Sequence, residues 1–135
     1  MKKYIIFIFI SCKEQFEFEY QSYDAVLKDN MMIKGWIPNI LPKTSKNISF
    51  INNIDNNEVV GKFYLYEPFE KSEVKTIDSS IIWHEYNKLC IKKESIVCNN
   101  DIYRENNKYY SYQHFYLIED SLHNVIYFFS IGDKY

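Results

Sequence analysis

The sequence contains few of the residues that form tight turns and reactive sites. Its 135 residues include only 3 glycines, 3 prolines, 3 cysteines and 3 histidines. Gly35, Gly61 and Gly132 lie too far apart to form a glycine-rich loop around a phosphate. So few glycines also argue against a barrel or sandwich with many glycine turns, and they predict turns built on Asn and Asp.

The chain has no excess of positive charge. It carries 16 Lys and Arg against 18 Asp and Glu, which gives a formal net charge of −2. The charge becomes −4 if residues 1–11, which contain Lys2 and Lys3, are removed. Proteins that bind a phosphate backbone need clustered basic residues, so the composition argues against nucleic acid as a partner.

The sequence also lacks the spacings of familiar metal and catalytic sites. His84-Glu85 resembles the start of a zinc-binding helix, but Lys88 occupies the position of the second histidine. Residues 55–58 offer oxygen atoms without the EF-hand order, so we interpret them as a turn. There is no G-x-S-x-G elbow. The sequence therefore predicts no metal, no cofactor and no catalytic residues.

Aromatic residues are frequent. They make up 19% of the chain, with 13 Tyr and 10 Phe, and 47% of the residues are apolar. Aromatic side chains suit pleated sheets, and this length fits one domain. We therefore predict an α+β fold in which one or two helices pack on an antiparallel sheet of about four to six strands that includes a C-terminal β-hairpin.

Local signals place the elements. Ser22 can cap a helix over residues 22–30, and Asn30 can end it in the left-handed conformation. A helix over 78–89 would place apolar residues on one face, although its β-prone residues leave a strand as the alternative. The remaining expected elements are an irregular segment after the first helix and strands over 47–51, 59–66, 109–118 and 125–131, the last two forming the hairpin.

The first residues have the plan of an exported protein. Lys2 and Lys3 precede an apolar run, Tyr4–Ile10, which is too short to cross a bilayer core of about 30 Å. A small residue, Ser11, then precedes Cys12. Charge, apolar run and small residue in this order are typical of a secretory signal.

The segment Phe9–Cys12 resembles a bacterial lipoprotein signal, in which the cysteine thiol receives diacylglycerol and becomes the first residue after cleavage. Phe9 departs from the pattern, in which Leu is usual. Lys13-Glu14 is similar to lipoproteins of the Bacteroidetes type, where charged residues after the cysteine can favour surface display. The resemblance implies a lipid on Cys12, attachment to the membrane and a place in the bacterial cell envelope. The alternative is that the apolar run is a buried first strand of a cytoplasmic protein.

The expected domain organisation follows from this signal. Residues 1–11 are the signal segment, residues 12–20 are a tether or an edge strand, and residues 21–135 are a single globular domain. The sequence has no internal repeat.

The segment Gly35–Pro42 (GWIPNILP), followed by Ile48 and by Asp55 and Asn57 before an aromatic strand, resembles a group of small bacterial proteins and lipoproteins. Those proteins carry a Gly-Trp-Leu-Pro…Leu-Pro segment, an Asp-x-Asn turn and an aromatic strand. The resemblance covers roughly residues 20–66. The family has no assigned catalytic residues, so the resemblance implies none here, and it agrees with the lipoprotein interpretation.

Two cysteines flank a charged stretch in LCIKKESIVC. If residues 93–95 form a hairpin loop, Cys90 and Cys98 face each other within reach of a disulfide. Such a bond persists in an oxidising envelope and not in the cytosol. Two buried thiols are the alternative.

The last hairpin carries aromatic side chains on both faces. In a continuous strand Tyr110, Tyr112 and Tyr116 share one face, and Tyr109 and Phe115 share the other. Tyrosine is favoured at interfaces, so the first face is a candidate binding face. The alternative is that both faces are packed in the core.

These observations give three hypotheses for function. The first is a non-catalytic, lipid-anchored envelope protein that binds another macromolecule. The second is an immunity-type protein that neutralises a toxin, because small, acidic, aromatic-rich domains often resemble such proteins. Its acidic charge would help association with a basic toxin. The alternative location for such a protein is the cytoplasm. The weakest is a small enzyme whose site is assembled from distant residues.

Overall fold

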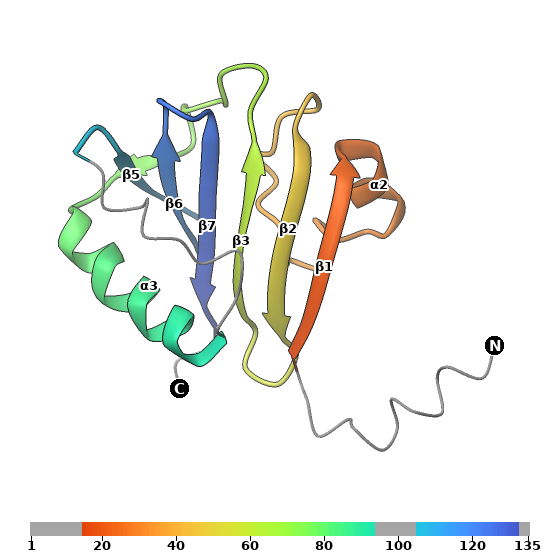
Figure 1. Ribbon diagram of the computed structural model, residues 1–135, viewed down its shortest axis with the longest axis horizontal. Helices are drawn as coiled ribbons and strands as arrows, with labels where there is room; N and C mark the ends of the chain where they lie inside the picture. The colour runs from red at the N-terminus through yellow and green to blue at the C-terminus, as the bar shows by residue number, and fades with distance from the viewer. Residues whose placement is uncertain (1–14, 94–104, 133–135) are drawn as a thin grey trace.

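The computed structural model describes residues 15–93 and 105–132, with side chains in the second helix described up to Leu89. These residues form one seven-stranded antiparallel sheet and two helices (Figure 1). In chain order the elements are β1 (Gln15–Ser22), α2 (Tyr23–Lys28), β2 (Lys46–Asn53), β3 (Glu58–Tyr64), β4 (Lys75–Thr76), α3 (Ser79–Lys93), β5 (Lys108–Tyr112), β6 (Phe115–Asp120) and β7 (Val125–Ile131).

The strand order across the sheet is β1-β2-β3-β7-β6-β5-β4. β1, β2 and β3 follow one another along the chain, and each pairs with the next. The chain then crosses to the other edge and returns strand by strand, so that β7 pairs with both β3 and β6. The last strand of the sequence therefore joins the two halves of the sheet.

The predicted fold class was wrong. The fold is mainly a seven-stranded sheet, whereas one or two helices on four to six strands were expected. The strand expected over 109–118 is two strands, β5 and β6, joined by the two-residue loop Gln113-His114. Neither residue is a usual turn former, although Gln113 adopts a left-handed φ of 53°. The rest of the difference comes from β1, for which an edge strand was one of two alternatives, and from the short β4.

Both helices follow local sequence signals. Ser22 caps α2, because its side chain accepts a hydrogen bond from the Ala25 N–H at 3.3 Å, and Asn30 has the expected left-handed φ of 57°. The segment over 78–89 is helical rather than a strand, and α3 continues to Lys93. The Asp78 carboxylate accepts a hydrogen bond from the Ser80 N–H at 2.8 Å at its start.

Two hydrophobic clusters lie on opposite faces of the sheet. One is covered by α2 and by the irregular segment after it, which contributes Ile37 and Leu41. The other is covered by α3, whose buried residues Ile82, Tyr86 and Leu89 contact the sheet. Since β7 lies in the middle, its alternating side chains are buried on both faces.

Candidate binding site

The two halves of the sheet are covered differently on the α3 face. α3 contacts β3, β5 and β7, and in Figure 1 it lies over the β5–β7 half of the sheet. Tyr86 packs edge-on against Phe129 of β7, with the ring centroids 5.5 Å apart, and the Trp83 indole N–H donates to the Tyr109 hydroxyl at 3.2 Å. No described helix lies over β1 and β2 on this face (Figure 1).

β1 has one aromatic face and one polar face, because its sequence QFEFEYQS alternates. Phe18 stacks on Phe50 of β2, with ring centroids 4.9 Å apart, and so belongs to the face that α2 covers. The next residues on either side, Glu17 and Glu19, therefore lie on the opposite face. The register places Glu19 beside Ser49 of β2.

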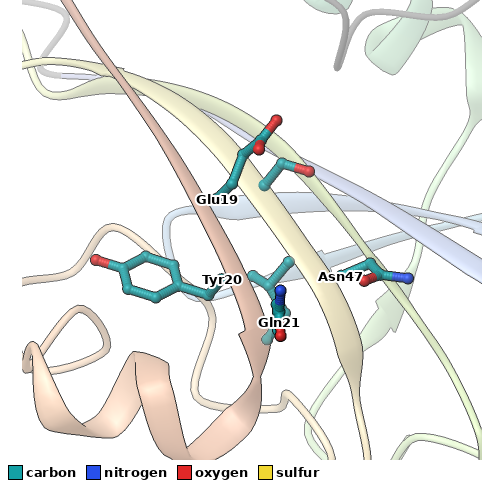
Figure 2. A pocket seen from close by; sticks show the side chains of 6 residues that line it. Glu19, Tyr20, Gln21 and Asn47 are labelled. Atoms are coloured by element: carbon teal, nitrogen blue, oxygen red, sulfur yellow. The ribbon is translucent and has the colours of Figure 1, made fainter.

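A shallow hollow of about 370 Å³ lies where β1 meets β2 (Figure 2). Its lining residues are Glu19, Tyr20, Gln21, Asn47, Ile48 and Ser49. Asn47 has a left-handed φ of 50°, at the point where the pairing of β2 with β3 shifts between Lys46 and Ser49. A β-bulge of this kind bends a strand and redirects its side chains. Figure 2 shows the Tyr20 ring pointing away from Glu19 and Asn47.

The outer strand carries acidic charge without a nearby partner. Glu17 and Glu19 are exposed, and neither forms a hydrogen bond or ion pair with another residue in the described part of the chain. Lys62 of β3 lies in the same cross-strand row as Glu19, one strand further in. Its ammonium lies 5.9 Å from the centre of the Tyr64 ring. Within residues 15–93 and 105–132, the carboxylates of Glu17 and Glu19 at the edge of the sheet have no ion-pair partner.

Tyr20 fixes the turn after α2 to β1. Its hydroxyl donates to the Asp29 carboxylate at 2.8 Å. Burial, followed by the hydrogen bond to Asp29 and the charge of that carboxylate, raises the pKa of Tyr20 to about 12. Because the hydroxyl is held as a donor, we assign Tyr20 a structural role.

A second hollow of about 310 Å³ lies at the end of the sheet where β7 finishes. It is lined by Lys34, Gly35, Trp36, Asn57, His114, Ser130 and Gly132. The His114 Nε2 atom lies 3.2 Å from the Gly35 carbonyl oxygen. The Gly-Trp segment therefore meets the β5–β6 loop, an arrangement that only the tertiary fold creates and that the sequence analysis did not predict.

The three tyrosines proposed as a binding face do not form one. Tyr110 and Tyr112 are buried in the hydrophobic cluster on the face of the sheet that α2 and the segment after it cover. Tyr116 packs against the cluster on the face that α3 covers. The two-residue loop explains the difference, because Tyr112 pairs with Phe115 and Ser111 with Tyr116. Paired residues share a face, so the loop reverses the alternation that a continuous strand would have kept.

A buried polar cluster surrounds Tyr110. Its hydroxyl donates to the Glu119 carboxylate at 3.1 Å, and the Lys71 ammonium lies 3.3 Å from the same oxygen. Burial and then the charge and hydrogen bond of Glu119 raise the pKa of Tyr110 to about 12. Phe69 packs edge-on against the Tyr110 ring, with the ring centroids 5.7 Å apart. These contacts hold the connection between β3 and β4 against the sheet.

The structure leaves the predicted cysteine sites untested. Cys12 and Cys98 lie outside the described residues, and Cys90 lies in α3. Since residues 90–93 are helical, the hairpin that motivated a Cys90–Cys98 disulfide does not form there, and the bond itself stays a prediction.

The described residues hold no group of three His, Cys, Asp or Glu side chains that could bind a metal. His84 lies on the exposed side of α3. No helix in residues 15–93 and 105–132 is long and apolar enough to span a membrane.

Residues 14–64 match a family model described as the YbbD head domain. The match covers less than half of the chain and coincides with β1, α2, β2 and β3, the part that holds the hollow and the acidic strand. It also overlaps the segment that carries the Gly-Trp resemblance. Neither the curated proteins nor the solved structures include a match to the chain.

Proposed function

We propose that this chain is a non-catalytic domain that binds another protein, and that a lipid on Cys12 holds it at the bacterial cell envelope. The observation that supports binding is the outer strand β1, whose exposed carboxylates Glu17 and Glu19 have no partner in the described part of the chain. The envelope location is supported by the resemblance of Phe9–Cys12 to a lipoprotein signal.

The negative charge of this surface favours a partner that carries positive charge. A basic protein would approach faster and in a fixed orientation, because complementary charges steer association and suppress wrong partners. The same acidic strand also favours the toxin-neutralising alternative, in which the basic partner is a toxin.

The environments of Tyr20 and Tyr110, the two tyrosines whose pKa values are raised to about 12, support a non-catalytic role. Strongly perturbed groups in a cleft are candidates for catalysis. Here, however, the hydroxyls of Tyr20 and Tyr110 are occupied as donors to Asp29 and Glu119. Tyr20 lines the hollow between β1 and β2, but its hydroxyl is already bonded to Asp29.

Site-specific cross-linking in the native host tests protein binding. A photoreactive amino acid at Gln21 should capture a basic protein, and the same probe at exposed Tyr66 should not. The double variant Glu17→Lys, Glu19→Lys should abolish the cross-link. The matched control Glu67→Lys, Glu73→Lys, which changes the charge equally on the β3–β4 connection, should preserve it. Equal cross-linking from both variants would refute the proposal.

The lipid anchor has its own test. Cys12→Ala should release the protein from the membrane fraction or leave it unprocessed, because two or three acyl chains hold a protein on a bilayer where one is marginal. Mass spectrometry of the native protein should show acylation of Cys12 as the first residue. An unmodified chain that begins at Met1 would contradict the anchor and favour a cytoplasmic protein.

A further inference from the structure

We propose that β1 receives an extended segment of the basic partner as an additional strand of the sheet, a segment in which basic and apolar side chains alternate. This inference rests on the proposed protein-binding function and specifies how the partner is held.

The backbone of β1 offers the first argument. β1 pairs with β2, and no other described strand lies on its outer side. A strand at the edge of a sheet leaves half of its N–H and C=O groups unpaired and so provides a template for another strand. β1 has 8 residues, whereas β4 at the opposite edge has 2, so the β1 edge is the one long enough for stable pairing.

The open part of this edge is its first half. α2 lies beside the end of β1 (Figure 1), where Tyr20 is bonded to Asp29. An incoming strand would therefore pair with the region from Gln15 to Glu19.

The two faces of β1 define the side chains of that strand. On one face an added residue would lie next to Glu17 or Glu19, and a Lys or Arg there would pair with a carboxylate that has no partner among the described residues. On the other face it would lie next to Phe16, which is 47% exposed, and Phe18, and an apolar residue there would extend the aromatic face. Alternation of basic and apolar residues satisfies both faces at once.

The same charges argue against a second copy of this chain as the occupant. Two β1 strands paired with matched faces would place Glu17 and Glu19 beside the same residues of the other copy. Like charges directly opposite each other destabilise a strand pair. The occupant that fits is therefore a different, basic chain.

A peptide of alternating Lys and Val, with the 8-residue length of β1, tests the mode of binding on the full chain. Amide NMR spectra should show shifts concentrated in β1, and the affinity should fall as salt rises. Glu17→Lys, Glu19→Lys should weaken binding at least about tenfold. The control Glu67→Lys, Glu73→Lys should retain it, and the spectra themselves report whether each variant is folded.

A second peptide with alternate N-methylated residues keeps the charges but cannot pair through its backbone. It should not bind. Equal binding of both peptides would overturn strand addition and leave protein binding intact, because the contact would then rest on side-chain charge alone. Absence of binding by either peptide would overturn the inference, while the cross-linking at Gln21 would still decide the proposed function.

The free chain provides a further check. Outward amides of β1 should exchange rapidly with solvent, and the chain should sediment as a monomer. Protected β1 amides in a monomer would show that another segment of the same chain occupies the edge, and protected amides in a dimer would show a second copy. Either result would overturn the proposal.

Discussion

Gly61 of β3 lies where Phe50 of β2 and Phe128 of β7 come closest to the backbone. A Cβ atom at this position would lie 2.4 Å from the Phe128 ring and 2.6 Å from both the Phe50 Cβ and the backbone carbonyl oxygen of Ser49. Its backbone has no positive φ, so the need for glycine here is one of space. Gly35 differs, because its φ is 83° and a Cβ there would meet its nearest atoms only at 4.0 Å.

Gly61→Ala should therefore destabilise the protein by about 1–3 kcal/mol, the usual cost of overpacking a core. The measurement is urea unfolding. In a Phe128→Leu background, which removes the ring contact but leaves those with Phe50 and Ser49, Gly61→Ala should cost somewhat less, whereas the cost of Gly35→Ala should be the same in both backgrounds. An unchanged cost of Gly61→Ala in the two backgrounds would show that the Phe128 ring contributes nothing to the steric cost.

Tyr110 should make the stability of the protein sensitive to alkaline pH. Its pKa is about 12 in the folded protein, against 10.0 for a free tyrosine. The stabilisation is therefore complete below pH 10.0 and is lost as pH rises towards about 12, because the unfolded chain loses its proton first.

Urea unfolding at a series of alkaline pH values checks this prediction. Tyr110→Phe should flatten the decline in unfolding free energy by as much as about 2 kcal/mol. A decline with the same slope in Tyr110→Phe and in the unaltered chain would show that Tyr110 does not link folding to pH.

The elements differ in how far the sequence predicts them, and the β5–β6 loop shows why. α2 is predicted because Ser22 and Asn30 are residues with specific roles at helix ends. Gln113 and His114 carry no comparable signal, so one strand was expected instead of two. The error then reversed the face assigned to Tyr116 and produced a binding face that the structure does not contain.

Replacing Gln113 by glycine should stabilise the protein by about 0.5–1 kcal/mol. A left-handed backbone costs a residue with a side chain about 1–2 kcal/mol, and part of that gain is offset by the entropy of glycine in the unfolded chain. Ser111→Gly in the middle of β5 is the control, and it should destabilise by about 0.5–1 kcal/mol. Thermal unfolding measures both. Destabilisation by both changes would mean that the φ of 53° at Gln113 is not strained.

At the scale of the whole molecule, the strand order could not be predicted from the sequence. Periodicity indicates that a segment is a strand, but it does not select the neighbour of that strand. Burial of both faces of the last hairpin was only an alternative in the sequence reasoning, whereas the apolar run VIYFFSI of β7 is buried on both faces, which is what a central strand requires. The acidic face of β1 is visible in the alternation QFEFEYQS, and an edge strand was one of the two alternatives for residues 12–20.

The strand order predicts a gradient of local stability. Backbone amides of the three central strands β3, β7 and β6 should exchange most slowly with solvent, and those of the edge strands β1 and β4 most rapidly. Hydrogen exchange followed by NMR measures the gradient. Equal protection of β1 and β7 would contradict the observed order.

The central position of β7 also determines when the sheet can be completed during translation. Residues 14–64 can form β1, β2 and β3 as a local meander soon after they leave the ribosome. One side of β3 then has no partner until residues 125–131, the last described strand of the sheet, have been made. During that interval the nascent chain exposes an apolar, aggregation-prone edge, which is the situation that chaperones protect. A message cut short before the codons of β7 should thus yield an insoluble product, even though most of the sheet has been translated.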